Sequence, residues 1–280
     1  MPRLFVDRIT VIDAAVLDRL RGLVGVSWIV DAALEGDLDE QGMVFDFGPA
    51  KRTIKEVIDA TADHKLIVPM GAPGLDLEST GGETRLRFVD DVGARFVHRG
   101  PEAALCRLDA PATEPGAVAT LLRERLAAAM PANVRGIDVR LRDELIEGAC
   151  YSYCHGLKKH AGHCQRIAHG HRSRLEIWAD GERSPARERR WADRWRDVYL
   201  GSREDLRADP GERRWRFGYT ADEGEFELEL DASRCDLLDG DTTVENIAAH
   251  IAASLKAEEP RRRFVVRAYE GVDKGAEASA

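Results

Sequence analysis

The sequence predicts an α+β protein made of two similar halves, each an antiparallel sheet with two helices on one face. Three observations support this prediction. Segments typical of strands and helices follow one another in the same order twice, the helices carry an apolar stripe, and no long linker separates the halves. We expect a first domain over residues 1–146, a second over 147–272, and a disordered tail over 273–280.

The first half opens with two segments typical of strands, 4–15 and 27–34, both rich in Val and Ile or Ala. A helix follows, for which Asp46 is a suitable N-cap and Pro49 a suitable first-turn residue. The apolar stripe of this helix consists of Ile54, Val57 and Ile58. The remaining segments are a strand at 85–89, a helix at 113–130 and a closing strand at 134–145.

The second half repeats this order, with strands at 149–155 and 174–179, a strictly alternating strand at 225–230, a helix at 243–256 and a closing strand at 263–269. Segments 70–112 and 181–222 are insertions whose purpose the pattern does not predict. The Arg-rich stretch 182–205 resembles a nucleic-acid-binding patch. Its interspersed Glu and Asp favour instead a solvated, ion-paired surface helix.

Composition excludes several classes of function. The chain has 280 residues, 44% of them apolar and 32% charged, as in soluble globular proteins. Its net charge of −9 gives no general case for binding nucleic acid or a membrane surface. No apolar run is long enough to cross a bilayer, and charges such as Asp7 and Asp13 argue against a signal peptide. Five cysteines fit a reducing compartment, so we expect a cytoplasmic protein.

Five of the eight histidines fall in one short stretch. His169 and His171 are two residues apart at the start of a predicted strand, so their rings point to the same face. His155, on a strand that can lie alongside, is the natural third ligand, and three imidazoles with an open fourth position form a common catalytic zinc site. The alternative is ordinary surface histidines, and we expect His160 and His163 in the polar loop to be solvated.

Several motifs recur together along the chain. They are Gly42-Met43-Val44-Phe45-Asp46-Phe47, Asp63-His64-Lys65, His155, Cys164, His169-Gly170-His171, Thr243-Val244-Glu245-Asn246 and Tyr269-Glu270. In this combination the chain resembles the 6-pyruvoyl- and 6-carboxy-tetrahydropterin synthases, which have the tunnelling fold (T-fold). The resemblance covers nearly the whole chain as two copies of a domain that usually occurs once. It implies tandem T-fold domains, zinc bound by the three histidines, a homo-oligomer and a reduced pterin as substrate.

The two halves depart from the family in complementary ways. In the first half, Val16, Val24 and Val26 occupy the positions of the zinc histidines, and valine cannot bind a metal. In the second half the Asp-His pair has no match, since the nearest segment, 230–232, lacks the imidazole. The resemblance therefore implies one composite site, assembled within a chain or between chains, in which each half supplies what the other lacks.

The resemblance also implies a role for each site residue. Cys164 is the candidate base, and His64, oriented by Asp63, assists it. Thr243 and Glu270 contact the substrate, with Glu270 pairing bidentately with the pterin's guanidine-like edge. Glu144, taken as the first-half match of Glu270, is an alternative anchor. The candidates for a triphosphate are Lys159, Arg166 and Arg172, with solvated loop charges as the other interpretation.

The expected function is a zinc-dependent lyase on a reduced pterin, most like 6-carboxytetrahydropterin synthase. That enzyme class converts 7,8-dihydroneopterin triphosphate on the route to 7-deazaguanine and queuosine. A 6-pyruvoyl-tetrahydropterin synthase or another divergent pterin enzyme is the first alternative. A non-catalytic pterin- or zinc-binding protein that retains the pocket is the second.

Overall fold

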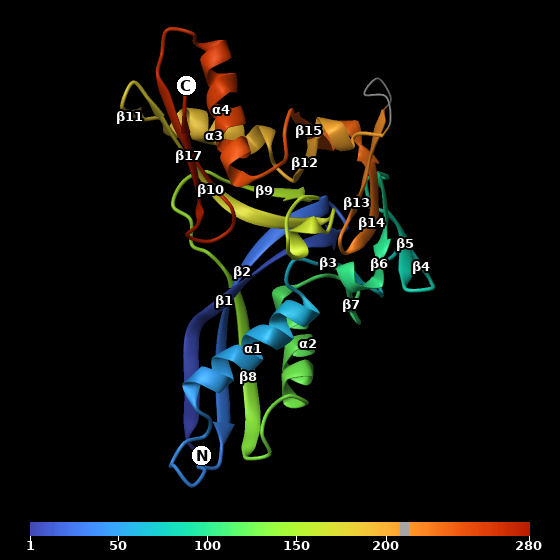
Figure 1. The fold of residues 1–280 in the computed structure, drawn as a ribbon, viewed down its shortest axis with the longest axis vertical. Helices are drawn as coiled ribbons and strands as arrows, with labels where there is room; N and C mark the ends of the chain where they lie inside the picture. The colour runs from blue at the N-terminus through green and yellow to red at the C-terminus, as the bar shows by residue number, and fades with distance from the viewer. Residues whose placement is uncertain (208–212) are drawn as a thin grey trace.

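The computed structural model describes residues 1–207 and 213–280; residues 208–212, inside the expected insertion 181–222, lie outside the described part. The two halves have the same sheet topology. The first sheet has the strand order β7-β3-β1-β2-β8, and the second has β15-β12-β9-β10-β16, extended by β17. Each is antiparallel at its central hairpin and parallel at one edge. The tandem α+β duplication predicted from the sequence is therefore confirmed (Figure 1).

The first sheet is built on a long hairpin whose strands face α1 and α2 on one side (Figure 1). Asp46 caps α1 as predicted, accepting a hydrogen bond from the Gly48 amide at 2.8 Å. Ile54 and Ile58 are buried on the inner face of this helix, so its apolar stripe packs on the sheet. The elements are β1 Arg3–Asp18, β2 Gly22–Gly36, α1 Phe47–Thr61, β3 Leu66–Pro69, β7 Leu105–Leu108, α2 Pro115–Ala127 and β8 Val134–Asp143.

The second sheet repeats this arrangement with α3 and α4 on one face. Its elements are β9 Cys150–His155, β10 His169–Ala179, β11 Glu182–Arg183, α3 Pro185–Arg194, β12 Val198–Ser202, β15 Cys235–Leu238, α4 Val244–Glu258, β16 Phe264–Tyr269 and β17 Gly275–Ser279. The expectation of a disordered tail over 273–280 is wrong, because β17 pairs with β16 from Gly275 to Ser279. This segment is held by backbone hydrogen bonds to the neighbouring strand. Its small and charged side chains give no sign of such pairing in the sequence.

The Arg-rich stretch holds α3, which is more than a surface helix. Trp191, on this helix, and Trp195, directly after it, are buried and belong to the core of the second half. Its exposed side carries the expected ion pairs, such as Arg190 with Glu258 at 2.5 Å. By its position between β10 and β12, α3 is the counterpart of α1, so this part of the expected insertion belongs to the repeated domain.

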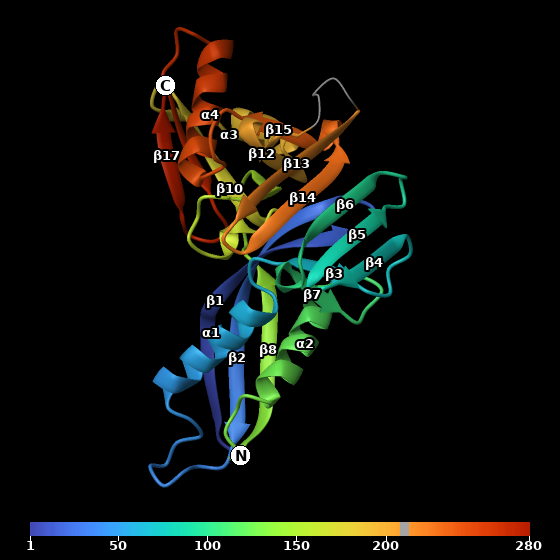
Figure 2. The same cartoon turned by 45° about the vertical axis from the view of Figure 1, so that its right-hand side comes forward.

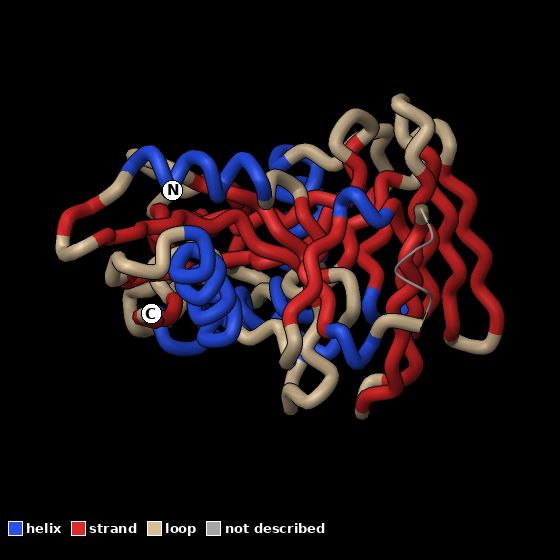
Figure 3. Tube along the Cα trace, turned by 90° about the horizontal axis from the view of Figure 1, so that it is seen from above, coloured by secondary structure: helices blue, strands red, loops and turns tan. Residues whose placement is uncertain are grey.

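The two insertions meet in a third sheet, with the order β13-β14-β6-β5-β4 (Figure 2). Its strands are β4 Leu75–Thr80, β5 Glu83–Val89, β6 Arg95–Pro101, β13 Arg214–Ala221 and β14 Gly224–Asp231. Because β6 and β14 pair through Leu228 and His98, one continuous sheet joins the two halves. Short 3-10 turns lie at Glu102–Ala104, His163–Gln165, Arg203–Asp205 and Ala232–Arg234. Figure 3 shows this sheet at the end of the molecule away from both termini.

The halves also pack directly, where β2 crosses β10 at two glycines. A Cβ on Gly170 would lie 2.7 Å from the Gly25 Cα, and one on Gly25 would lie 2.6 Å from the His171 amide nitrogen. No side chain fits at either position, so glycine permits this close approach. The crossing brings the second half's histidines against the first half's β1. Among the described residues, no helix is long and apolar enough to span a membrane.

Candidate metal centre

Three histidines converge at the end of the β9–β10 hairpin. His155 pairs directly with His169 across the two strands, and His171 lies opposite Tyr153 on the same face. His155 and His169 are fully buried, and His171 is 1% exposed. Their candidate ligand atoms all lie within 4.8 Å of one another, and the Nε2 atoms of His155 and His171 are 3.2 Å apart. The H-x-H pattern and the third histidine thus meet as the sequence predicts.

The outer ring nitrogens show which atoms are free for a metal. The Nδ1 of His155 donates to the Thr242 carbonyl at 2.9 Å, and the Nδ1 of His169 donates to the Arg166 carbonyl at 2.9 Å. A carbonyl only accepts, so each Nδ1 carries the proton and each Nε2 offers a lone pair. The His169 Nε2 is buried with no hydrogen-bond partner. Burial also lowers the pKa of both rings well below the usual range, which keeps them neutral. This donor set fits a zinc ion.

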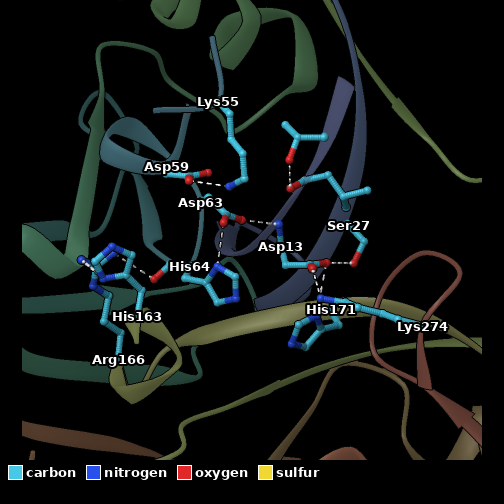
Figure 4. Close-up of polar contacts among 12 residues, drawn as sticks. Asp13, Ser27, Lys55, Asp59, Asp63, His64, His163, Arg166, His171 and Lys274 are labelled. Carbon is cyan, nitrogen blue, oxygen red and sulfur yellow. Dashed lines mark hydrogen bonds and ion pairs between the residues drawn. The ribbon is translucent and has the colours of Figure 1, made fainter. Parts of the chain in front are cut away.

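Asp13 supports the third histidine from the other half of the chain, and the sequence interpretation missed this role. Its carboxylate lies 3.2 Å from the Nδ1 of His171, accepts from the Ser27 hydroxyl at 2.5 Å, and meets the Lys274 amine at 3.1 Å (Figure 4). Burial opposes ionisation, but His171 and Lys274 outweigh it and hold the pKa of Asp13 below its usual value. A carboxylate inside a Val- and Ala-rich strand was the available signal.

Asp63 and His64 reach the histidines within the same chain. The Nδ1 of His64 lies 2.8 Å from the Asp63 carboxylate, whose other oxygen accepts from the Asp13 backbone amide at 2.9 Å. The His64 ring lies 5.3 Å from the His169 ring, and its ligand atom is within 4.8 Å of those of Cys164 and His169. Burial disfavours the charged ring, but hydrogen bonds to Asp63 and Cys164 outweigh it and raise the pKa of His64 to about 10.

The β13–β14 hairpin holds the segment around Cys164 in place through side-chain contacts. Glu223, between β13 and β14, accepts from Arg166 at 2.8 Å and lies 2.5 Å from the Nδ1 of His163. The Tyr219 hydroxyl donates to the Gln165 carbonyl at 2.7 Å. His163 is half-exposed but has these partners, so it is not simply solvated. The Arg166 side chain is 6% exposed and paired, which leaves it unsuited to a triphosphate.

The remaining predicted residues lie around this centre. Glu270 follows β16 directly, and its charge contributes to the raised pKa of the buried Tyr151 and Tyr153, for which burial is the main cause. Thr243 caps α4, accepting from the Asn246 amide at 3.4 Å, and follows Thr242, which holds His155. Glu144 lies 3.4 Å from Arg174, and one of its carboxylate oxygens is buried without a hydrogen-bond partner.

Comparison with known proteins finds a family likeness in the first half. Residues 19–151 match the family model described as 6-pyruvoyl tetrahydropterin synthase, so this part of the chain is similar to that family. The matched segment contains Asp63 and His64 and ends before His155, so the metal candidates lie outside it.

Solved structures of 6-pyruvoyltetrahydropterin synthases are similar to part of the chain. A catalytic residue mutant of the Plasmodium vivax enzyme is 16% identical, with a TM-score of 0.42, and the match covers 50% of this chain and 90% of that one. The Plasmodium falciparum enzyme is 17% identical, with a TM-score of 0.41 and the same coverage. Comparison with curated proteins gave no match.

Proposed function

We propose that the chain is a zinc-dependent lyase acting on a reduced pterin, most like the 6-carboxytetrahydropterin synthases. One observation carries the proposal: the convergent Nε2 atoms of His155, His169 and His171 lie beside the Cys164–His64–Asp63 cluster. Zinc at the three nitrogens would supply a Lewis acid that polarises the hydroxyls of the pterin side chain. The family match of the first half supports a pterin as the substrate class.

The protein's own residues account for the proton transfer. Cys164 is partly exposed and its thiol is hydrogen-bonded to His64, so it is placed to take a proton from the substrate carbon. His64 is placed to exchange that proton with the thiol, and Asp63 fixes the orientation of the ring by bonding its Nδ1. The cluster lies in one chain, which favours a site completed in cis. The expected homo-oligomer stays a prediction, tested by light scattering during size-exclusion chromatography.

Substrate binding is assigned to Glu270 and Thr243. The Glu270 carboxylate, directly after β16, presents two acceptors to a planar edge with two donors, which is what the pterin's guanidine-like group offers. Thr243 stands at the start of α4, next to the residue that holds His155. For the triphosphate no cation is assigned, because Arg166 is buried and paired with Glu223, and Lys159 lies between two carboxylates, Asp241 at 3.0 Å and Glu204 at 3.5 Å.

The test is metal analysis of the purified chain, followed by turnover of 7,8-dihydroneopterin triphosphate with product identification by mass spectrometry. Stoichiometric zinc and a 6-carboxytetrahydropterin product are expected. A 6-pyruvoyl product would move the assignment to the sibling enzyme. Zinc without turnover of any reduced pterin would indicate a binding protein, and protein without zinc would refute the metal site.

A further inference from the structure

The interface between the halves contains a second position equivalent to the metal centre. Val16 pairs with Val24 across β1 and β2 as His155 pairs with His169 across β9 and β10. At the crossing, Gly25 follows Val24 and Gly170 follows His169, so the two glycines are counterparts as well. The strand positions around the histidines therefore have counterparts in the first half.

A cavity of about 410 Å³ lies at the second position. Its lining includes Val24 and Val26 in place of two histidines, and Ser152 and Arg172, which are the counterparts of Asp13 and Ser27. The β1–β2 turn is short, whereas the β9–β10 connection carries Cys164, so the first half has no equivalent of the Cys164 segment.

The Asp-His pair also has a structural counterpart, which the sequence interpretation placed wrongly at 230–232. Leu66 lies beside Ala15 on β1, and Tyr199 lies beside Cys154, the matching residue of β9. Two residues earlier are His64 and Asp197, and both have a positive φ, 52° and 57°. Asp63-His64 therefore corresponds to Arg196-Asp197, and both of the latter residues line the cavity.

The position of the pterin-anchoring carboxylate is retained at the second position. The register of β10 with β16 continues to place Glu270 opposite Ser173, and Trp28, the counterpart of Ser173, pairs with Asp143. Asp143, one residue before the expected Glu144, is thus the match of Glu270 and lines the cavity. At the second position, Val24 and Val26 stand where the metal centre has histidines, and Asp143 stands where it has Glu270.

The charges around the cavity favour a ligand that also carries negative groups. Arg172 donates to the Glu144 carbonyl at 3.0 Å, and in the described ranges no carboxylate forms an ion pair with it. Over the same ranges, Arg196 pairs only with the exposed Asp193, at 2.6 Å, and solvent screens this contact. Asp197 also lines the cavity but is paired with Arg21 at 2.5 Å. The two guanidinium groups and the Asp143 carboxylate above an apolar wall suit a planar ring with a donor edge and an anionic substituent.

We propose that this cavity is a second, non-catalytic binding site for a phosphorylated pterin. The proposal rests on the function proposed above, since it assigns to Asp143 the ring-anchoring role given to Glu270. Valine at the metal-ligand positions removes the Lewis acid. Cys150 lines the cavity, but no imidazole does, so this thiol lacks the partner that Cys164 has in His64. The chain would then hold two pterins, one converted and one retained.

Equilibrium dialysis of the zinc-loaded full chain with neopterin triphosphate, whose oxidised ring is not the expected substrate, tests the stoichiometry. Two molecules per chain are expected. Asp143→Asn should retain one molecule and full turnover, whereas Glu270→Gln should retain one molecule and lose turnover. Asp138→Asn, on the same strand β8 and exposed, is the matched control and should bind two.

Arg196→Gln provides an independent variant, because its side chain is exposed and its loss leaves the fold intact. It should weaken the second binding event at least several-fold and leave the first unchanged. One molecule per chain in the wild type, with turnover intact, would overturn the second site and leave the proposed function standing. Turnover without sensitivity to Glu270→Gln would overturn the anchoring role on which both rest.

Discussion

The two halves share one topology but differ at three matching strand positions. The second half has His155, His169 and His171 there, and the first half has Val16, Val24 and Val26. The first half instead contributes Asp13, Asp63 and His64, which meet the histidines across the interface. Neither half therefore contains every group of the proposed site.

The largest effect is expected from removing a metal ligand. His169→Ala should lose the zinc and bring turnover to background, since its Nε2 is one of three convergent donors. Its counterpart Val24→Ala is the matched control. It should keep zinc and turnover and lower the free energy of unfolding by about 1 to 3 kcal/mol through lost packing. Metal analysis and steady-state kinetics measure zinc content and turnover in both variants. Zinc retained by His169→Ala would contradict the difference assigned to the two halves.

Loss of the first half's imidazole should remove catalysis but not metal. His64→Ala is expected to lower kcat by about 10² to 10⁴-fold, the usual contribution of a proton-transferring group, while zinc remains bound. Mixing His64→Ala with Cys164→Ala tests where the site is completed. The two residues meet within one chain, so the mixture should stay inactive. Recovery of activity would show that the groups come from different chains.

A smaller effect is expected from the carboxylate behind His171. Asp13→Asn should weaken zinc binding by about 10- to 100-fold, the usual cost of losing the group that orients a ligating histidine. Competition with a chelator of known affinity measures this. Asp31→Asn is the control, because Asp31 lies on β2 and pairs with Arg142 at 2.7 Å. Equal zinc affinity in the two variants would show that Asp13 does not support the metal ligand His171.

The sheet that joins the halves should respond to acid. Burial lowers the pKa of His98 from 6.5 to about 4, so the ring is neutral in the fold. The unfolded chain takes up a proton first as pH falls, so stability drops between about pH 6.5 and 4, by about 3 kcal/mol. His98→Leu should flatten this part of the urea-unfolding profile. An unaltered slope in His98→Leu would contradict the assignment.

Local patterns predicted much of this fold. The Asp46 cap, the stripe of α1 and the alternation in β14 each depend on residues close in sequence, so periodicity shows them. The convergence of His169 and His171 follows equally from a strand period of two. The resemblance to the family matched Val16, Val24 and Val26 with the three histidines, and the strand registers of the two hairpins agree.

Contacts between distant segments could not be predicted in this way. Asp13 meets His171 across more than 150 residues, and Lys274 reaches Asp13 from the segment that was expected to be disordered. Both depend on how the halves pack, which no local pattern encodes. The third sheet is a similar case, because β6 and β14 come from insertions in different halves. Even Asp197, the match of His64, emerges only when strand registers are compared.

The Asp13–His171 contact has a consequence for how the protein matures. Asp13 is synthesised long before the histidines and is buried on β1 of the first half. During synthesis the carboxylate precedes the imidazole, so the contact between them forms only when the second half docks on the first. Under the proposed function, tight zinc binding would therefore report that the two halves have docked.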